Sequence, residues 1–261
     1  LPYQSDPVCR EKINTGQMQY MDIHLSHVAQ HAWAGFYGKL NIAVIEVVGI
    51  NEDGSLIPAC SVGNNKTWID QADHVILEVN YALNEKLNGM HDIYYGTALP
   101  PHRKPVPITD VSDRIGQQYL SCPAEKIIAI VETHALDRDN AFTEPDAASK
   151  KIADHILAFL ESEVKKGVLP SNLLPIQSGV GNIANAVMAG LNEGKFENLT
   201  SYTEVIQDGM LAMIKSGKLV KVSATSLSLS RKGFEELFAN IDFYRERIIL
   251  RTQEISNHPE V

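Results

Sequence analysis

The sequence has few cysteines, no excess of basic charge and no long apolar run. Its three cysteines, Cys9, Cys60 and Cys122, are far apart and lack Cys-x-x-Cys spacing, which argues against a disulfide framework and for a reducing compartment. No apolar run approaches the roughly 20 residues of a membrane-spanning helix, and no signal-peptide pattern opens the chain. We therefore expect a cytoplasmic protein without a membrane partner, or a mitochondrial one if the source is eukaryotic.

Basic residues are outnumbered by acidic ones. There are 23 Lys and Arg against 32 Asp and Glu, so the formal net charge is −9. A nucleic-acid-binding protein usually presents a basic face, and the short basic run Arg103-Lys104 lies among prolines, as in a solvated loop. We therefore expect no nucleic-acid partner. Hydrophobic residues make up 44% of the 261 residues, which is ordinary for a globular protein with a sizeable core.

The pattern changes near residue 140, and we predict parts of two similar α/β domains, at residues 1–140 and 141–261. The first region contains short apolar and β-branched runs of strand length. Four prolines between Thr97 and Pro107 exclude a regular helix there. The strands predicted in this region are Ile42–Val48, Leu56–Ser61, His74–Val79 and Lys126–Val131.

The second region alternates helices and strands. Its first helix is expected to have its cap at Thr143 or Asp146 and to end near Gly167. Its apolar stripe consists of Ile152, Ile156, Leu157, Leu160 and Val164. The strands expected after it are Leu173–Gln177, Leu199–Thr203, Leu219–Ala224 and Arg247–Arg251, and the helices between them are Asn182–Leu191, Asp208–Lys215 and Arg231–Ala239. This alternation predicts open, mostly parallel sheets with flanking helices.

A strand, a glycine turn and a helix follow one another at residues 174–187. Gly179 and Gly181 allow the backbone to turn sharply and to approach a ligand closely. The N-terminus of the next helix offers unpaired N–H groups and the positive end of a dipole, which suit a phosphate or a developing oxyanion. The pattern Gly-x-Gly-x-x-Ala also approaches the dinucleotide-binding fingerprint. A nicotinamide-dependent oxidoreductase therefore stays open as an alternative, as does a turn that serves packing only.

Glu204 lies at the carboxyl end of the strand predicted at Leu199–Thr203, and Asp208 is expected to cap the following helix. Ligands of parallel sheets bind beyond the carboxyl ends of the strands. A carboxylate in that place can act as a nucleophile, a general base or a ribose ligand. A solvated loop acid is the commoner alternative for a lone glutamate.

Several blocks of the sequence together resemble the acetyl-CoA hydrolase/transferase family, close to its succinyl-CoA:acetate CoA-transferases. The blocks occur in the same order as in the family and span essentially the whole chain. In the second region they are residues 174–191, 202–210, 223–230 and 255–261. In the first region they are residues 2–5, 22–26, 91–94, 113–116 and 128–133.

The resemblance implies a class I CoA-transferase that exchanges CoA between an acyl-CoA and a small carboxylate, or an acetyl-CoA hydrolase of the same family. The family's catalytic glutamate, which forms acyl-glutamyl anhydride and glutamyl-CoA thioester intermediates, matches Glu204. Its glycine turn matches Gly179-Val180-Gly181, with the Val180 N–H as an oxyanion donor. Its active-site asparagine matches Asn257, which we expect at the end of the last strand.

The resemblance also implies partners and domain identities. Arg138 matches an arginine near the family's site and is expected to bind a carboxylate. The acyl-CoA and the acid are substrates, no cofactor or metal ion is expected, and a homodimer is expected. Residues 1–140 would be the remainder of an N-terminal CoA-transferase domain, and residues 141–261 the first part of a C-terminal catalytic domain.

Family members are longer at both ends, and the second glycine-rich loop of their site would lie after Val261. The chain also starts at Leu1 rather than Met. Both ends are therefore interpreted as cuts through a longer chain, with a processed N-terminus and a natural stop as the alternatives. We expect residues 1–261 alone to be inactive.

His24, His27 and His31 share one helical face at spacings of three and four. Such a face can bind a metal ion. No acidic or cysteine partner is evident in the sequence, which favours a surface or packed face instead.

Overall fold

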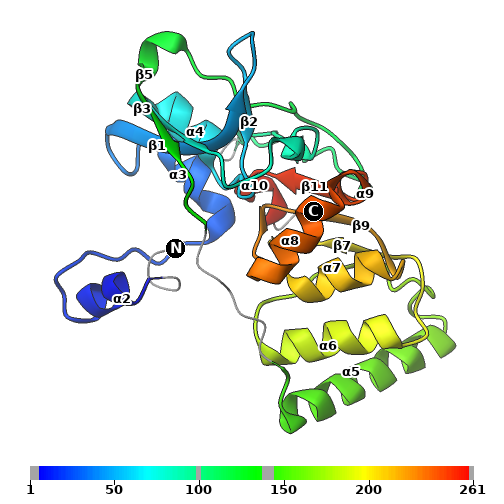
Figure 1. Ribbon diagram of the computed structural model, residues 1–261. Coiled ribbons are helices and arrows are strands. Elements are labelled where there is room, and N and C mark those ends of the chain that lie inside the picture. The colour runs from blue at the N-terminus through cyan, green and yellow to red at the C-terminus, as the bar shows by residue number, and fades with distance from the viewer. Residues whose placement is uncertain (1–5, 98–100, 137–143, 259–261) are drawn as a thin grey trace.

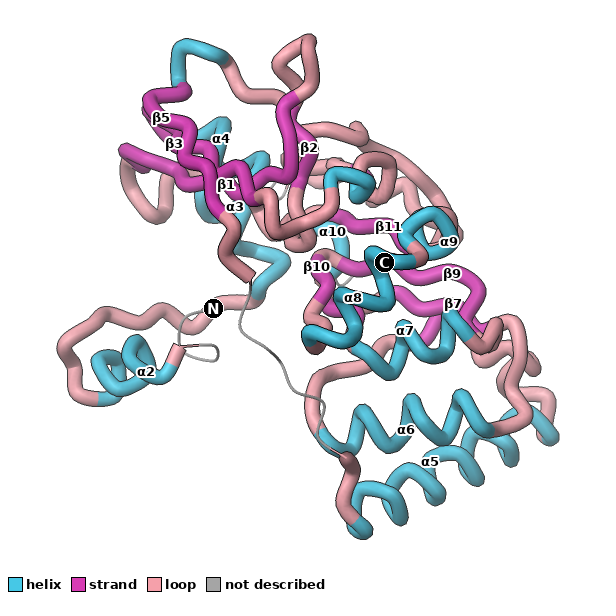
Figure 2. The backbone as a smooth tube through the Cα atoms, in the orientation of Figure 1, coloured by secondary structure: helices cyan, strands magenta, loops and turns pink. Residues whose placement is uncertain are grey.

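The computed structural model describes residues 6–97, 101–136 and 144–258 as a mixed α/β fold (Figure 1). Two main sheets, both largely parallel, are flanked by helices (Figure 2). This confirms the fold class expected from the alternation of strands and helices. None of the helices in the described part of the chain has the length and apolar character needed to span a lipid bilayer.

The first sheet is built from the β-branched runs of the first region, in the order β2-β1-β3-β5. β3 pairs in parallel with both β1 and β5, whereas β2 returns antiparallel to β1. All four strands lie where the sequence predicted them, although β2 ends before the predicted end at Ser61. They are β1 (Leu40–Ile50), β2 (Leu56–Pro58), β3 (Ala72–Asn80) and β5 (Ile127–Thr133).

Short helices accompany the first sheet. α4 packs on β1 and β3, and α3 packs on α4, while α2 projects away from both sheets (Figure 1). The described part of the proline-rich loop, residues 101–107, contains no helix or strand, as predicted. The elements are α2 (Pro7–Asn14), η1 (Leu25–His27), α3 (Val28–Trp33), α4 (Asn65–Gln71), η2 (Glu85–Leu87) and η3 (Ala124–Lys126).

The second sheet has the order β4-β11-β9-β7-β6, and all its pairs are parallel. Its strands are β4 (His91–Asp92), β6 (Pro175–Ile176), β7 (Leu199–Tyr202), β9 (Leu219–Ala224) and β11 (Ile248–Arg251). A small parallel pair follows the ends of β7 and β9, formed by β8 (Val205–Ile206) and β10 (Ser226–Leu227). Because β4 comes from the first region, residues 1–140 and 141–261 share this sheet, and their division into two domains stays a prediction.

The helices of the second region lie side by side next to the second sheet (Figure 1). α7 packs on β9 and α8, α6 on α7, and α5 on α6 at the edge of the molecule. The bounds of α7, α8 and β9 agree with the predicted ranges. The helices are α5 (Ala147–Lys165), α6 (Asn182–Glu193), α7 (Asp208–Lys215), α8 (Arg231–Ala239), α9 (Ile241–Arg245) and α10 (Gln253–Ser256).

The ends of α5 follow the predicted signals, but its stripe does so only in part. Asp146 caps the helix by accepting a hydrogen bond from Ser149 N at 2.7 Å, and the chain turns at Gly167, where φ is 74°. Ile152 and Ile156 are 41% and 36% exposed, whereas the later stripe residues pack on the core. The neighbouring α6 therefore covers only part of the predicted apolar face.

Two local predictions were wrong. Asp208 does not cap α7, because Gln207 is the N-cap residue. The Asp208 carboxylate instead accepts hydrogen bonds from Ser230 N at 3.0 Å and Ser230 Oγ at 2.9 Å, which ties α7 to the start of α8. The strand predicted from Leu173 begins only at Pro175, because Leu173 and Leu174 have positive φ values of 63° and 65°.

One continuous hydrophobic core extends from the first sheet to the second. Ile45 and Leu77 represent it in the first sheet, and Leu199, Val222 and Leu250 in the second, all without exposed surface. Sliding one sheet past the other would expose this apolar surface to water, which is unfavourable. Segments from both regions can therefore be held in fixed positions around one site.

His91 of β4 is buried in the core in its neutral form. Its Nε2 lies 3.0 Å from the Ala59 carbonyl oxygen, to which it donates. Its Nδ1 has no partner among the described residues. Burial therefore lowers the pKa of His91 from 6.5 to about 4.

The stability of the protein is expected to fall as the pH drops from about 6.5 to about 4. In that window the unfolded chain takes up a proton on His91 that the folded chain does not, which lowers the free energy of unfolding by up to about 3 kcal/mol. His91→Gln, which can still donate to Ala59, should lose most of this dependence, whereas the exposed His74→Gln should keep it. Urea unfolding across the window measures the effect, and equal slopes for wild type and His91→Gln would contradict it.

Candidate active site

Glu204 lies just past the carboxyl end of β7, and its backbone is fixed by the chain around the end of β9. Thr203 N donates to Ser223 O at 2.9 Å, and Thr225 N donates to Glu204 O at 2.9 Å. The side chain is half-buried. Among the described residues, none forms a hydrogen bond or ion pair with its carboxylate. The carboxylate is therefore held in place through its backbone while its oxygens remain available for chemistry.

Glu204 lines a pocket of about 860 Å³, and the lining also includes Pro175 of β6 and Thr200 and Tyr202 of β7. Residues 108–111 of the first region form one wall, and the end of α10, with Asn257 and His258, forms another. Of the described residues that line the pocket, Glu204 and Asp110 are acidic and none is Lys or Arg. The described lining therefore contains no side chain with a permanent positive charge.

The glycine turn starts beside the end of β7. Ile176 of β6 pairs with Ser201 of β7, and Thr203 Oγ1 donates to Ser178 O at 3.0 Å. This hydrogen bond brings the residue before Gly179 next to the residue before Glu204. The sequence block that runs through the turn is thus adjacent to the glutamate in space.

The turn has the backbone features of an anion-binding loop. Gly181 is the N-cap residue of α6 with φ 119°, a conformation that strains any residue with a Cβ. Val180 is 68% exposed, and among the described residues none accepts a hydrogen bond from its N–H. Gly179, Val180 and Gly181 are not among the residues that line the pocket. The convergence of the Val180 N–H and Glu204 on one substrate atom therefore stays a prediction.

Asn257 lines the same pocket as Glu204. We expected Asn257 at the end of the last strand. Instead the helix α10 follows that strand, and Asn257 is its C-cap residue. Ser256 Oγ donates to Asn257 Oδ1 at 2.9 Å. With its oxygen engaged in this way, the Asn257 amide has its N–H groups to offer to a substrate.

The three histidines that the sequence places on one helical face are not among the residues that line this pocket. Arg138 lies outside the described residues. The rings of His24 and His27 are 5.5 Å apart, and those of His27 and His31 are 6.3 Å apart. No group of three or more His, Cys, Asp or Glu in the described residues could hold a metal ion.

Residues 1–132 match the family model for the acetyl-CoA hydrolase/transferase N-terminal domain. The chain belongs to the acetyl-CoA hydrolase/transferase family. Membership confirms the resemblance carried by the collinear sequence blocks.

Two relatives in this family align with the whole chain. A succinyl-CoA:acetate CoA-transferase of Clostridium kluyveri is 49% identical over 261 residues, and the chain covers 48% of it. An acetyl-CoA hydrolase of Candida glabrata is 43% identical over 267 residues, and the chain covers 50% of it. The chain thus spans about half the length of the curated relatives it matches.

The fold agrees with a solved structure of a CoA-transferase. A 4-hydroxybutyrate CoA-transferase of Porphyromonas gingivalis superposes with a TM-score of 0.61, over 100% of this chain and 55% of that one. The two sequences are 21% identical. At that identity the likeness concerns the fold alone.

Tyr202 also lines the pocket, although sequence reasoning assigned it no role. Its hydroxyl donates to Ile255 O at 2.8 Å, which ties β7 to α10. Burial raises the pKa of Tyr202 to about 12, so the hydroxyl keeps its proton. The strand that precedes Glu204 and the helix that precedes Asn257 are therefore joined directly.

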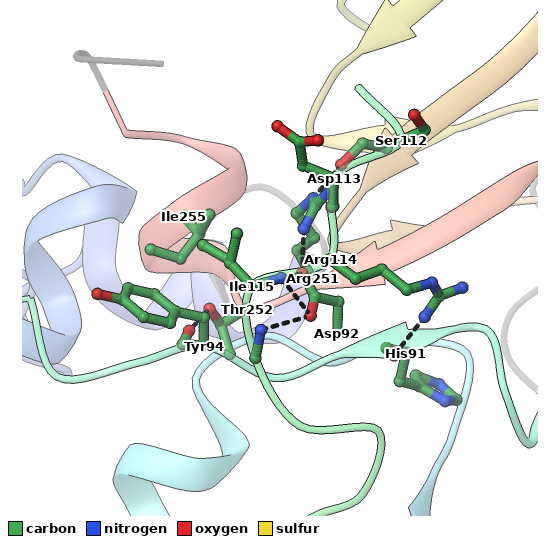
Figure 3. Close-up of polar contacts among 12 residues, drawn as sticks. His91, Asp92, Tyr94, Ser112, Asp113, Arg114, Ile115, Arg251, Thr252 and Ile255 are labelled. Atoms are coloured by element: carbon green, nitrogen blue, oxygen red, sulfur yellow. Dashed lines mark hydrogen bonds and ion pairs between the residues drawn. The ribbon is translucent and has the colours of Figure 1, made fainter. Parts of the chain in front are cut away.

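Arg251 is the second residue that sequence reasoning missed. It ends β11 without exposed surface, and Figure 3 shows it beside Asp92 of β4, with which it forms a buried ion pair. Arg251 Nε donates to Ser223 Oγ at 2.6 Å. No local pattern could reveal this pair, because the partners meet only once β4 and β11 lie side by side.

Proposed function

We propose that the protein transfers CoA between an acyl-CoA and a small carboxylate, such as succinyl-CoA and acetate, through a thioester on Glu204. One observation carries the proposal. The Glu204 carboxylate is half-buried, has no partner among the described residues and lines the same pocket as Asn257. Similarity to the succinyl-CoA:acetate CoA-transferase supports it.

The scheme uses Glu204 as a covalent nucleophile. A Glu204 oxygen attacks the thioester carbonyl, and CoA thiolate leaves, so that an acyl-glutamyl anhydride forms. The thiolate then attacks the glutamyl carbonyl, which releases the first acid and forms the glutamyl-CoA thioester. The second acid attacks this thioester and expels CoA thiolate, which takes the new acyl group and frees Glu204. The scheme requires neither a metal ion nor a redox cofactor.

The neighbouring groups have roles in this scheme. The Val180 N–H and the start of α6 would stabilise the oxyanion that forms at each attack, with Gly179 and Gly181 giving the turn its shape. The Asn257 amide N–H would hold a carbonyl or carboxylate oxygen in the pocket. Arg138 would supply the positive charge for the acid that the described pocket residues lack. We also propose a homodimer and a cytoplasmic location for the protein.

Hydrolysis is the second candidate function, because the acetyl-CoA hydrolase of Candida glabrata is 43% identical to the chain. In this reaction a water oxygen attacks the carbonyl carbon of the intermediate in place of the second acid. Glu204 is regenerated, and no new acyl-CoA forms. Assays with and without an added acid separate the two functions.

Trapping with borohydride is expected to modify Glu204. The protein expressed from its complete coding sequence is incubated with acetyl-CoA and then with borohydride, which reduces a glutamyl thioester to an alcohol. Peptide mass spectrometry should find this change at Glu204 and at no other carboxylate, Asp110 included, and Glu204→Gln should show none. Modification of another carboxylate, or of none, would argue against the covalent mechanism.

A further inference from the structure

The pocket wall formed by residues 108–111 belongs to no helix or strand. It comes from the first region, whereas Glu204 and Asn257 come from the second. No sheet or helix sets its position beside Glu204, and hydrogen bonds from side chains hold it there. Those contacts form two layers, one within the segment and one beneath it.

The first layer bonds the segment to itself. The Asp113 carboxylate accepts hydrogen bonds from Thr109 N at 2.8 Å, Thr109 Oγ1 at 3.0 Å and Asp110 N at 2.9 Å. The Asp110 carboxylate accepts one from Ser112 N at 2.8 Å. Residues 109–113 thus form a compact turn. A contact that fixes part of this turn therefore also fixes the pocket wall.

The second layer is the Arg251 guanidinium. Its Nη2 donates to Val111 O at 3.2 Å and also to Asp113 O. Its other nitrogens bind Ser223 of β9 and Asp92 of β4. Asp92 in turn accepts hydrogen bonds from the backbone N–H groups of residues 115 and 116. One buried side chain therefore joins the wall to the strands of the second sheet.

The same side chain also relates the wall to the other two sides of the pocket. Arg251 is followed by Thr252, the N-cap residue of α10, whose other end carries Asn257. Ser223, which Arg251 binds, accepts the backbone hydrogen bond from Thr203, the residue before Glu204. The wall, Asn257 and Glu204 are thus all connected through Arg251, either by its hydrogen bonds or by the chain next to it.

We propose that Arg251 is a positioning residue that directs the intermediate on Glu204 to a carboxylate rather than to water, by holding residues 108–113 as a wall of the pocket. This inference rests on the function proposed above. An acid must meet the intermediate in one orientation, and a displacement of about 1 Å can lower such a rate by roughly 100-fold. Water needs no such orientation, and a loosened wall admits it. Loss of Arg251 should therefore slow transfer more than hydrolysis.

The test compares transfer with hydrolysis in the protein expressed from its complete coding sequence. Acetyl-CoA with succinate measures transfer, and release of CoA thiol without an acid measures hydrolysis. Arg251→Lys keeps the charge beside Asp92, but one ammonium group cannot reach Ser223 and both carbonyls. We expect kcat for transfer to fall about 10- to 100-fold, KM for succinate to rise and the ratio of hydrolysis to transfer to rise about tenfold.

Asp113→Ala keeps the test valid if Arg251→Lys does not fold. Asp113 is only half-buried. Its replacement removes the hydrogen bonds that its carboxylate accepts from Thr109 and Asp110, and it leaves no buried charge unpaired. It should shift the same ratio in the same direction, by a smaller factor. Arg245→Lys is the matched control, because Arg245 pairs with Asp242 outside the pocket. It should leave both rates unchanged.

Folded variants with the wild-type ratio would overturn the inference, even if both reactions were slower, because equal losses indicate a purely structural role. A raised ratio in Arg251→Lys or Asp113→Ala, with Arg245→Lys unchanged, supports it. Failure of the proposed function is recognised separately. In that case the wild-type protein shows no borohydride-trapped Glu204, whatever the variants do, and the inference fails with it.

Discussion

Replacing Glu204 with alanine is expected to lower CoA transfer by at least about 10⁴-fold, since the variant lacks the carbonyl carbon to which CoA becomes bonded in the proposed mechanism. The fold should be unaffected. The carboxylate has no partner among the described residues, and a half-buried side chain in a bend contributes little packing. Steady-state transfer from acetyl-CoA to succinate, together with thermal melting, measures both outcomes.

Two further variants sharpen this test. Glu204→Asp keeps a carboxylate but withdraws it by one methylene, so it should recover a small part of the rate and remain far below wild type. Glu235→Ala removes an exposed glutamate of α8 and should behave as wild type. If Glu204→Ala keeps most of the transfer activity, the nucleophile lies elsewhere.

The strands and helices could be predicted where the signal is local. β1 is rich in β-branched residues and α4 packs on it, and α8 has a serine cap that the structure confirms, with Ser230 Oγ accepting from Gly233 N at 3.1 Å. α7 and β9 have the predicted bounds because their apolar residues follow the period of a helix or a buried strand. In these elements local propensity and the tertiary structure favour the same conformation.

Prediction failed where position depends on distant partners. β4 contains only His91 and Asp92, which is too short for any period, and it exists because β11 pairs with it. Asp208 has the residue type of a cap, yet its carboxylate accepts hydrogen bonds from Ser230 at the start of α8. The candidate site shows the same limit. The strand end drew attention to Glu204, but its role and Asn257 came from a family resemblance, whereas the wall at residues 108–111 could be found only in three dimensions.

The largest loss of stability is expected from Asp92→Asn. The ion pair between Asp92 and Arg251 has side-chain exposures of 2% and 1%, so the substitution leaves a buried guanidinium without its counter-charge. Removing one partner of such a pair typically destabilises a protein by about 3–5 kcal/mol, which corresponds to a drop of roughly 10 °C in Tm. Asp242→Asn is the matched control, because its pair with Arg245 is exposed and should contribute less than about 1 kcal/mol.

A double variant then separates stability from the placement of the pocket wall. Asp92→Asn combined with Arg251→Met removes both charges, and replacing a buried pair by uncharged groups of similar size is often neutral. Thermal melting should therefore show the double variant to be clearly more stable than Asp92→Asn alone. Transfer should nevertheless stay low, because methionine cannot donate to Val111 O or Asp113 O and the wall loses its anchor. If Asp92→Asn melts within about 1 °C of wild type, a change well under 1 kcal/mol for a chain of this size, the buried pair contributes little to stability and the sheet does not depend on it.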